Sequence, residues 1–505
     1  MQTHTTFTNP VIKGFNPDPS IIRVNDDYFL CTSSFEFFPG VPIYHSKNLV
    51  NWELINYCLT SESQLDLNNC RHSGGIYAPT LRYHNGKFYM ITTNVGSKKR
   101  KNTGNFFVYT DDIYGNWSAP TFIEHEGIDP SLFIDDDNKV YFCGTGDDDK
   151  GSGIVLFEIN LENGNILSDK KVISRGCGGR NPEAPHIYKI DNMYYLLLAE
   201  GGTEYGHMIT IQRSKNILGP YEPCPHNPII THRDNYSHNF QCLGHGDLIQ
   251  DSNDSWWMVF LGIRTTTGLL HHLGRETFLS PIVWKNGWPE KIDSVNSKIN
   301  ALLPNELLTD VSVFHTDFTE SSLPLDFNWI RNPDSSAYIL DAKSQCLHLV
   351  GKSYGLTGHR LSPTWTGIRQ KDFNTSTSTC IRLNMENKTV AGLSAYYMDT
   401  HHYDLQIHKI EGEYYIELKK VIYDLESIVF SKAIAGEKII LRIRSDKEYY
   451  YFDYSISDET FENIGKGLTA ALSTESSEYM TFTGTYLGIF AQNGIASFDY
   501  FHYEW

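Results

Sequence analysis

A short apolar strand, a polar turn and an aromatic-rich strand recur in this order five times in the first 290 residues. The second strand of each copy alternates its side chains with the period of two that is typical of β-strands. The turns are rich in Asn, Asp and Gly, which tolerate positive φ or bond to their own backbone. The pattern therefore predicts hairpins and excludes a helical solenoid. The copies align on Pro19, Pro79, Pro130, Pro185 and Gly246.

The spacing of the copies predicts the architecture. Successive alignment residues lie 60, 51, 55 and 61 positions apart. A repeat of about 50 residues is the size of one four-stranded blade of a β-propeller. We therefore predict an all-β chain that begins with a five-bladed β-propeller over residues 1–295.

Residues at equivalent places in the five copies should form a ring at one mouth of the central channel, because the innermost strand of each blade lines that channel. Asp18, Asp129 and His245 stand immediately before the alignment residue, and Glu183 stands two positions before it. A single aspartate before proline is often only a turn residue. Three acids on one ring repel one another, so their convergence indicates a catalytic use.

A different strand pattern follows the repeats. Residues 296–312 read as a linker, and short alternating strands from 313 to 505 predict a concanavalin-like β-sandwich. Asp317 and Asp499, near the two ends of the sandwich sequence, are a candidate pair for a Ca²⁺ ion. The predicted strands are 337–340, 346–350, 392–398, 404–410, 413–419, 439–444, 449–455 and 485–492.

Composition narrows the class of ligand. The 505 residues carry a formal net charge of −18, which argues against nucleic acid and against an anionic membrane surface, although Lys98-Lys99-Arg100-Lys101 forms a basic loop. Aromatic residues make up 13%, and that excess suits stacking on a neutral sugar. No stretch approaches the ~20 apolar residues of a membrane span, and the start of the chain lacks the regions of a signal peptide.

Cysteine usage predicts the compartment. The nine cysteines are an odd number and include no C-x-x-C pair. This usage indicates reduced thiols, and we predict a cytoplasmic protein.

The ring of acids is suited to glycoside hydrolysis. That reaction needs one protonated carboxyl to protonate the leaving oxygen and one ionised carboxylate to attack or to activate water. A third carboxylate can orient the acid and hold its pKa high by charge repulsion. Two other readings stay open: a non-catalytic carbohydrate-binding propeller, and an endo-arabinanase with an open cleft.

The sequence resembles glycoside hydrolase family 43, and within it the two-domain β-xylosidases and α-L-arabinofuranosidases. The likeness covers essentially the whole chain, including a tail, 482–501, that is similar to the C-terminal sandwich of the family. The motifs that carry it are Asn16-Pro17-Asp18-Pro19-Ser20, Thr32-Ser33-Ser34-Phe35-Glu36-Phe37-Phe38-Pro39-Gly40-Val41-Pro42, Ser131-Leu132-Phe133, Pro182-Glu183-Ala184-Pro185, Glu200-Gly201-Gly202-Thr203, Gly244-His245-Gly246-Asp247-Leu248 and Leu273-Gly274-Arg275-Glu276-Thr277.

The resemblance implies an inverting mechanism. Asp18 would be the general base and Glu183 the general acid, while Asp129 would position Glu183 and tune its pKa. Arg275 would bind hydroxyls of the terminal sugar, and His245 would sit at the channel centre, where the equivalent histidine of some relatives helps to hold Ca²⁺.

The resemblance also implies a closed pocket that favours release of one terminal sugar. Phe35 would form an apolar wall, Thr203 would lie beside the acid, and Phe482 of the sandwich would close the pocket. Two pocket positions depart from the xylosidase pattern: Tyr77 replaces a common Trp, and Ile128 replaces a Phe of some members. The balance between the two activities therefore stays open, and one site could serve both sugars.

The expected partner is a xylo- or arabino-oligosaccharide, and the sequence is compatible with a homo-oligomer. No cofactor is required by the proposed chemistry. A Ca²⁺ ion at His245 would depend mostly on water ligands, and its removal would then change the rate without unfolding the chain.

Overall fold

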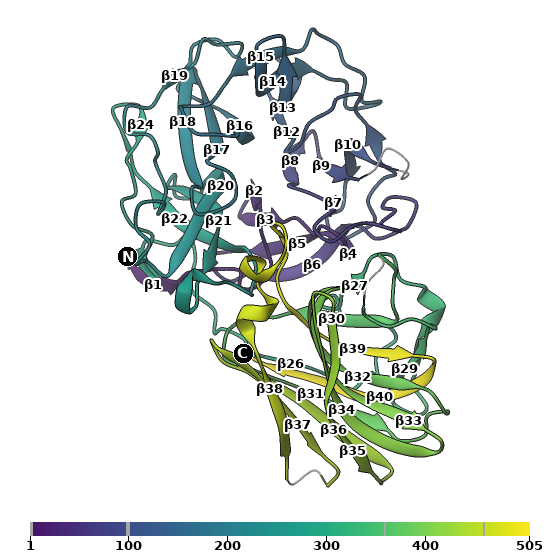
Figure 1. The fold of residues 1–505 in the computed structure, drawn as a ribbon. Helices are drawn as coiled ribbons and strands as arrows, with labels where there is room; N and C mark the ends of the chain where they lie inside the picture. The colour runs from purple at the N-terminus through teal and green to yellow at the C-terminus, as the bar shows by residue number, and fades with distance from the viewer. Residues whose placement is uncertain (1–3, 97–101, 358–359, 458–459) are drawn as a thin grey trace.

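The regular structure of the computed structural model is almost entirely β (Figure 1). It describes residues 4–96, 102–357, 360–457 and 460–505, so the first three residues and the basic loop at 98–101 lie outside the described part. No helix within those ranges is long and apolar enough to cross a membrane. The described helical turns are the short 3₁₀ segments η1 (Thr267–Leu269), η2 (Ser335–Ala337), η3 (Thr469–Leu472) and η4 (Thr474–Ser476).

Five antiparallel sheets follow one another along the first part of the chain, and each contains the two strands of one predicted copy. The first is β2 (Ser20–Val24), β3 (Asp27–Cys31), β5 (Gly40–Ser46) and β6 (Glu53–Leu59). The second is β8 (Thr80–His84), β9 (Lys87–Val95), β10 (Gly104–Thr110) and β11 (Thr121–Phe122), with β7 (Gly75–Ile76) also on β9. The third is β12 (Ser131–Ile134), β13 (Val140–Asp148), β14 (Gly151–Glu158) and β15 (Lys171–Ser174). The fourth is β16 (Glu183–Ile190), β17 (Met193–Glu200), β18 (Met208–Ser214) and β19 (Glu222–Pro223), and the fifth is β20 (Phe240–Gln250), β21 (Trp256–Arg264) and β22 (Glu276–Ile282).

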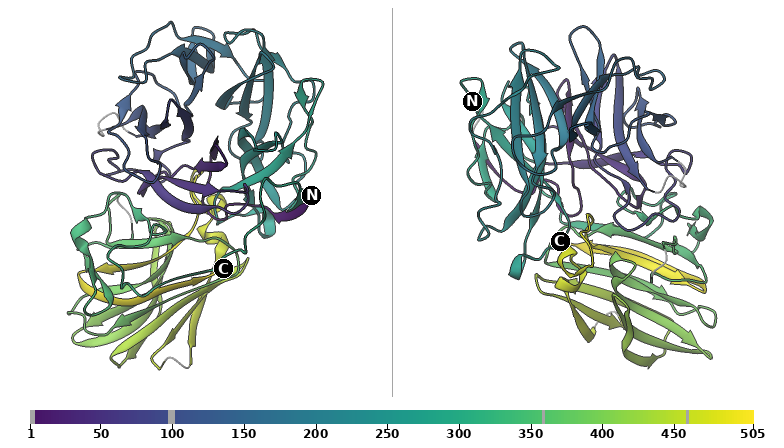
Figure 2. Two further views of the ribbon diagram at one scale, coloured as in Figure 1. Left: turned by 180° about the vertical axis from the view of Figure 1, so that it is seen from behind. Right: turned by 45° about the horizontal axis from the view of Figure 1, so that its top comes forward.

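The first strands of the five sheets contact one another in cyclic order, from β2 through β8, β12, β16 and β20 back to β2 (Figures 1 and 2). We call these five strands the first-strand ring. Residues that begin the ring strands are far apart in sequence but meet around one axis. Apolar clusters fill the spaces between neighbouring sheets, as where Phe29 and Met90 share one core.

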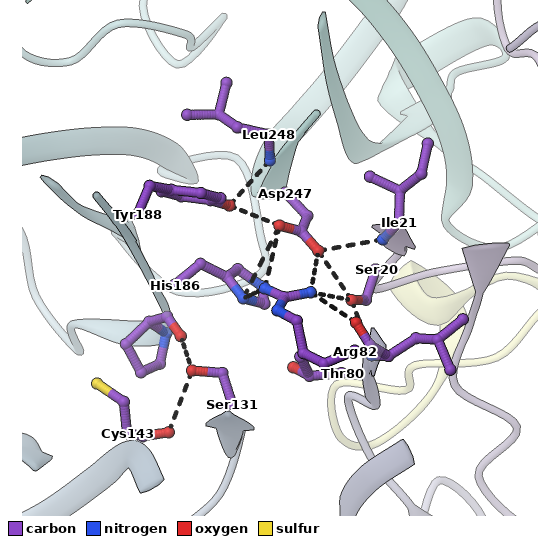
Figure 3. A network of polar contacts seen from close by, with 12 residues as sticks. Ser20, Ile21, Thr80, Arg82, Ser131, Cys143, His186, Tyr188, Asp247 and Leu248 are labelled. Atoms are coloured by element: carbon purple, nitrogen blue, oxygen red, sulfur yellow. Dashed lines mark hydrogen bonds and ion pairs between the residues drawn. The ribbon is translucent and has the colours of Figure 1, made fainter. Parts of the chain in front are cut away.

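Asp247 is fully buried in the first-strand ring and connects several sheets (Figure 3). It accepts hydrogen bonds from Ser20 Oγ at 2.8 Å, Arg82 Nη1 at 3.0 Å and Tyr188 Oη at 2.5 Å. Arg82 Nη2 also lies 2.9 Å from His186 Nδ1. Burial alone would raise the pKa of the Asp247 carboxyl, but the Arg82 charge and these bonds hold that pKa well below its usual range.

Hydroxyl and amide bonds complete the ring (Figure 3). The Leu81 amide donates to Ser20 Oγ at 3.0 Å, and Thr80 Oγ1 donates to the Pro130 carbonyl at 2.9 Å. Ser131 Oγ donates to the Pro185 carbonyl at 2.5 Å. Each ring strand is therefore bonded to the next by a polar contact that is shielded from water.

Asp247→Ala should lower the free energy of unfolding by about 3–5 kcal/mol, because it removes the carboxylate that neutralises the buried Arg82 charge. Thermal melting should show the loss, and the double variant Arg82→Met/Asp247→Leu should recover part of it by removing both charges. Asp137→Ala is the control, since Asp137 faces only Lys139 at an exposed site, and it should change stability by less than about 0.5 kcal/mol. Equal melting of Asp247→Ala and the unchanged chain would show that the network does not stabilise the fold.

The second part of the chain consists of two large antiparallel sheets around one apolar core. One sheet has the order β28 (Tyr338–Asp341), β29 (Cys346–Gly351), β40 (Gly494–Glu504), β31 (Thr375–Arg382), β36 (Lys438–Ser445), β37 (Tyr449–Ser455) and β38 (Glu462–Leu468), with β26 (Val313–Thr316) also on β40. The other has the order β30 (Trp365–Arg369), β39 (Tyr486–Gln492), β32 (Val390–Met398), β33 (His401–Ile410), β34 (Glu413–Ile422) and β35 (Leu425–Ile434). All eight predicted strands overlap observed ones, whereas β26, β27 (Trp329–Ile330), β30, β31, β35, β38 and β40 were not predicted.

The two parts of the chain are joined by strand pairing and by a shared apolar cluster. β4 (Phe37–Phe38) pairs with β27 (Trp329–Ile330), and the Phe37 ring stacks on Tyr486 at 4.1 Å between centroids. The segment predicted as a linker contains β25 (Lys298–Ala301), which pairs with β1 (Thr5–Thr8). A further short pair, β23 (Trp284–Lys285) with β24 (Trp288–Pro289), lies between the fifth sheet and β25.

Candidate active site

Four residues adopt a left-handed backbone, three of them at the start of ring strands and the fourth, His245, within β20 at a break in its register. The φ angles are 56° at Asp18, 54° at Asp129, 50° at Ala184 and 49° at His245. Such conformations cost about 1–3 kcal/mol each for residues with a Cβ and tend to cluster at functional sites. They occupy equivalent places in four of the five predicted copies, so the repeat itself carries this turn.

Asp18 is held as a buried carboxylate among polar partners. Its Oδ1 accepts a hydrogen bond from Arg275 Nη1 at 3.0 Å, and Ser33 Oγ donates to its Oδ2. His245 Nδ1 lies 3.5 Å from Oδ1. Burial lowers the pKa of His245, with Arg275 acting in the same direction and Asp18 opposing it, so the imidazole is neutral at neutral pH. The positive charge beside Asp18 therefore comes from Arg275.

Glu183 and Asp129 form an acidic pair with raised pKa values. Burial raises the pKa of Glu183 to about 7, and the Asp18 charge adds to this effect while Arg275 and Arg180 oppose it. Burial and the charges of Glu183 and Asp18 raise the pKa of Asp129 well above its usual range. Near neutral pH the two carboxyls can thus retain a proton that an exposed carboxyl would lose.

Arg275 connects the acids to the second part of the chain. In addition to Asp18, its Nη1 donates to Thr203 Oγ1 at 3.1 Å, and its Nη2 donates to the Phe482 carbonyl at 3.2 Å. The guanidinium carbon lies 5.4 Å from the ring centroid of Phe35 and 5.3 Å from that of Phe482. The contacts of Arg275 therefore bring together Asp18, Thr203, Phe35 and Phe482, all of which the sequence analysis names as candidate site residues.

Three aromatic rings pack together on the apolar side of the site. The ring centroids are 5.1 Å apart for Phe35 and Tyr77, 5.6 Å for Phe35 and Phe482, and 5.9 Å for Tyr77 and Phe482. Phe35 is buried, whereas Tyr77 and Phe482 are partly exposed. Ile128 directly precedes Asp129, and its described hydrogen bonds join its backbone to Thr145. The contacts therefore bring Tyr77 into the aromatic group, while the pocket role of Ile128 stays a prediction.

Comparison with known families decides the class of enzyme. Residues 7–289 match the family described as Glycosyl hydrolases family 43, and residues 315–504 match the Beta xylosidase C-terminal Concanavalin A-like domain. The chain belongs to glycosyl hydrolase family 43. It is an all-β glycoside hydrolase with a concanavalin-like C-terminal domain, which argues against the alternative of a non-catalytic binding module.

Its relatives in family 43 carry the names of two activities. The chain is 40% identical to a non-reducing end alpha-L-arabinofuranosidase of Bacteroides ovatus, over 99% of this chain and 94% of the relative. It is 35% identical to a beta-xylosidase of Bacillus subtilis, over 98% of this chain and 99% of the relative. The solved structure named Bacteroides ovatus Xyloglucan PUL GH43B superposes with a TM-score of 0.93 at 38% identity, covering 99% of this chain and all of that one (100%).

The Ca²⁺ sites considered in the sequence analysis, at His245 and at Asp317 with Asp499, stay predictions. In the described ranges no group of three or more His, Cys, Asp and Glu side chains is arranged to hold a metal ion. The neighbour of His245 is Asp18, which already binds Arg275. Asp499 is paired with Arg382 at 2.5 Å, and Asp317 caps its own turn at Thr319, so each has a local partner. We derive no step through a metal.

Sequence reasoning missed several residues that support the site. Ser33 bonds Asp18, although its motif was noted only for its resemblance. His207 is buried next to the centre, where burial lowers its pKa to about 3 and its Nδ1 lies 2.9 Å from the Cys242 carbonyl. Glu200 is fully buried and accepts the amides of Cys177 at 2.7 Å and Gly179 at 2.6 Å in the loop that leads to Glu183. Ser33 lies in the first copy and both Glu200 and His207 lie in the fourth, and none of them stands at the position that the copies share.

Proposed function

We propose that this chain is an exo-acting, inverting glycoside hydrolase that releases terminal xylose from β-1,4-xylo-oligosaccharides and also accepts α-L-arabinofuranosides. The proposal rests on one observation. Two carboxyls with raised pKa values, Glu183 and Asp129, share a buried site with Asp18, which is bound by Arg275. Inverting hydrolysis requires one protonated and one ionised carboxyl at the same time.

The proposed division of roles follows the local environments. Asp18 accepts the proton of the attacking water, and Glu183 donates a proton to the leaving oxygen. Asp129 positions Glu183, and a charge on Asp129 would disfavour ionisation of Glu183 by repulsion. Arg275 and Thr203 bind sugar hydroxyls, and Phe35 with Tyr77 forms the apolar wall. The partner is a neutral oligosaccharide, for which an acidic chain creates no barrier.

We further propose that the five sheets are the blades of a five-bladed β-propeller over residues 1–295, joined through 296–312 to a sandwich over 313–505. The cyclic contacts of the first-strand ring support this arrangement. A cytoplasmic location is part of the same proposal, and the nine free cysteines are compatible with it. The oligomeric state stays open.

The sequence analysis leaves one alternative open, in which α-L-arabinofuranosidase is the main activity of the chain. The smaller Tyr77 in the apolar wall favours it, as does the similarity to a Bacteroides ovatus arabinofuranosidase. Measuring kcat/KM on p-nitrophenyl β-D-xyloside and p-nitrophenyl α-L-arabinofuranoside with one preparation tests the proposal. Activity on at least the xyloside is expected, and a more than tenfold preference for the arabinofuranoside would make the second activity the main one. No activity on either would overturn both.

Xylotetraose should yield xylose and xylotriose as its first products, because Phe482 of the second domain closes one side of the pocket. The Phe482 ring packs on Phe35 and Tyr77, and its carbonyl is bound by Arg275. Chromatography of an early time course measures the products. Xylobiose as the first and sole product would contradict the exo assignment and favour an open cleft.

Chelation tests the Ca²⁺ prediction. An ion at His245 would depend mostly on water ligands, so EDTA should change the rate while the melting temperature stays the same. The measurement compares kcat in EDTA, in added Ca²⁺ and in untreated enzyme. Identical rates in all three would remove Ca²⁺ from the reaction.

A further inference from the structure

One loop of the second domain, residues 481–485, is bound to the first domain along its length, and we call it the docking loop. The Phe482 amide donates to Ser73 Oγ at 2.9 Å, and the Phe482 carbonyl accepts from Arg275. The Thr485 amide donates to the His272 carbonyl at 2.8 Å. The position of Phe482 in the pocket is therefore set by bonds that cross between the domains.

Ser73 is hydrogen-bonded to both residues whose rings are partly exposed at the site, Tyr77 and Phe482. Its hydroxyl accepts from the Phe482 amide, and its carbonyl accepts from Tyr77 Oη at 3.2 Å. It is almost fully buried and has a φ of 55°, a left-handed conformation that is unusual for serine. A small shift of this residue would move Tyr77 and Phe482 relative to each other.

A buried acid holds Ser73 in place. Glu36 Oε2 accepts from the Ser73 amide at 2.9 Å, and Glu36 Oε1 lies 2.5 Å from His72 Nδ1. His72 Nε2 in turn lies 3.3 Å from Thr483 Oγ1 of the docking loop. Both side chains of the Glu36–His72 pair are 2% exposed. A carboxylate at such a depth is costly unless it is paired, and both its oxygens are directed at residues that bind the docking loop.

Close backbone packing leaves the docking loop no room to move toward the first domain. A Cβ on Gly484 would lie 2.2 Å from the Leu273 carbonyl oxygen, and a Cβ on Gly274 would lie 2.9 Å from the Gly484 Cα. These two glycines allow Leu273 and Gly274, which directly precede Arg275, to touch the loop.

We propose that Ser73, held by Glu36, is a positioning residue that sets the position of the Tyr77 and Phe482 rings relative to each other and thereby determines which terminal sugar fits against them in the pocket. The inference rests on the proposed function, in that the pocket takes a terminal sugar. Ser73 acts through the two rings and does not touch the reacting atoms. A pyranose and a furanose differ in width, so a change in the relative position of the two rings should affect the binding of the two sugars unequally.

The test replaces Ser73 by alanine in the full chain. Loss of the acceptor for a buried amide should raise KM for p-nitrophenyl β-D-xyloside about tenfold. The value of kcat should fall by less than about threefold, because general acid and base catalysis by Glu183 and Asp18 is left in place. The ratio of kcat/KM between the xyloside and the corresponding arabinofuranoside should change at least threefold. Peptides that cover the docking loop should exchange amide hydrogen faster, while other peptides of the second domain keep their protection.

Tyr57→Phe is the matched control. Tyr57 is a buried residue of the first domain whose hydroxyl donates to the Leu325 carbonyl at 3.0 Å and accepts from Asn328 Nδ2 at 3.0 Å, so this variant also loses bonds between the domains, away from the docking loop. It should leave KM, the substrate ratio and exchange of the docking loop unchanged. Gly484→Ala, which pushes the docking loop away from Leu273, should reproduce the change in KM seen with Ser73→Ala.

The outcomes distinguish a failure of the positioning role of Ser73 from a failure of the proposed hydrolase function. Faster exchange of the docking loop in Ser73→Ala with unchanged KM and substrate ratio overturns the positioning role. Unchanged exchange overturns it as well, whatever the kinetics show. An unmodified chain that cleaves neither glycoside defeats the proposed function, and the exchange experiment then decides by itself whether Ser73 holds Phe482.

Discussion

Asp18→Ala should reduce hydrolysis of both xylobiose and p-nitrophenyl β-D-xyloside by about 10⁴-fold, the upper range for loss of a general base. The attacking water must lose a proton whatever group departs, so an activated leaving group should not reduce the loss of rate. Asp18 is buried and its Oδ1 binds Arg275 at 3.0 Å, which fixes the position of the carboxyl group. Steady-state kcat on the two substrates measures the effect.

Asp18→Asn is the matched control for folding. An amide oxygen can still accept the Arg275 hydrogen bond, so thermal melting should stay close to that of the unchanged chain while activity is lost. Retention of a tenth or more of the activity in Asp18→Asn would contradict the assignment of the base.

Product stereochemistry gives an independent check on Asp18. If Asp18 activates water, the first xylose released from a β-xyloside is the α anomer. Proton NMR of the first minutes of reaction resolves the two anomers. A β anomer in the initial product would make Asp18 a nucleophile in a retaining enzyme.

The repeats explain why the acids could be predicted from sequence. Asp18 and Asp129 occupy the same place in two copies, and the structure gives both the same left-handed backbone. Residues at equivalent positions of the copies lie close together in the structure, because the ring strands contact one another in cyclic order. Glu183 lies one residue before the position that corresponds to Asp18 and Asp129 in the repeat. Its neighbour Ala184 occupies that position and has the same left-handed backbone.

Residues outside the repeat could not be found in this way. Ser73 and Glu36 act on the docking loop, more than 400 positions later in the chain, and no local pattern connects them. The Arg82–Asp247 pair was missed for a similar reason, since its members come from different sheets. Nearness that depends on tertiary packing leaves no periodic signal in the sequence.

Some strands of the second domain are not predicted from the sequence for a different reason. β31 alternates Thr and Ser over much of its length, and Thr377 and Thr379 are fully buried although they are polar. β35 is an edge strand whose side chains are mostly exposed, including Leu425. An alternation of apolar and polar side chains predicts a strand only when the inward face is apolar and the outward face is polar. Neither strand meets that condition.

Glu183→Ala should lose about 10³-fold in kcat on xylobiose, whose leaving group needs a proton, and much less on p-nitrophenyl β-D-xyloside, whose leaving group departs as an anion. The unchanged enzyme needs Glu183 protonated, and burial raises the pKa of Glu183 to about 7. Activity on xylobiose should therefore fall as the pH rises through about 7, and this fall should be absent in Glu183→Ala. The pH profile of kcat/KM on both substrates measures the two effects.

Asp129→Asn tests the cause of the raised pKa. If Asp129 is ionised in the active form, its negative charge favours the protonated form of Glu183, so its removal should lower the pKa of Glu183 and move the basic limb of the profile to lower pH. Activity on xylobiose at pH 7 should then fall between that of the unchanged chain and that of Glu183→Ala. A basic limb that moves to higher pH would show that Asp129 carries the shared proton in the active form. In that case Asp129 would serve as a hydrogen-bond donor to an ionised Glu183, and the roles of the acid pair would be reversed.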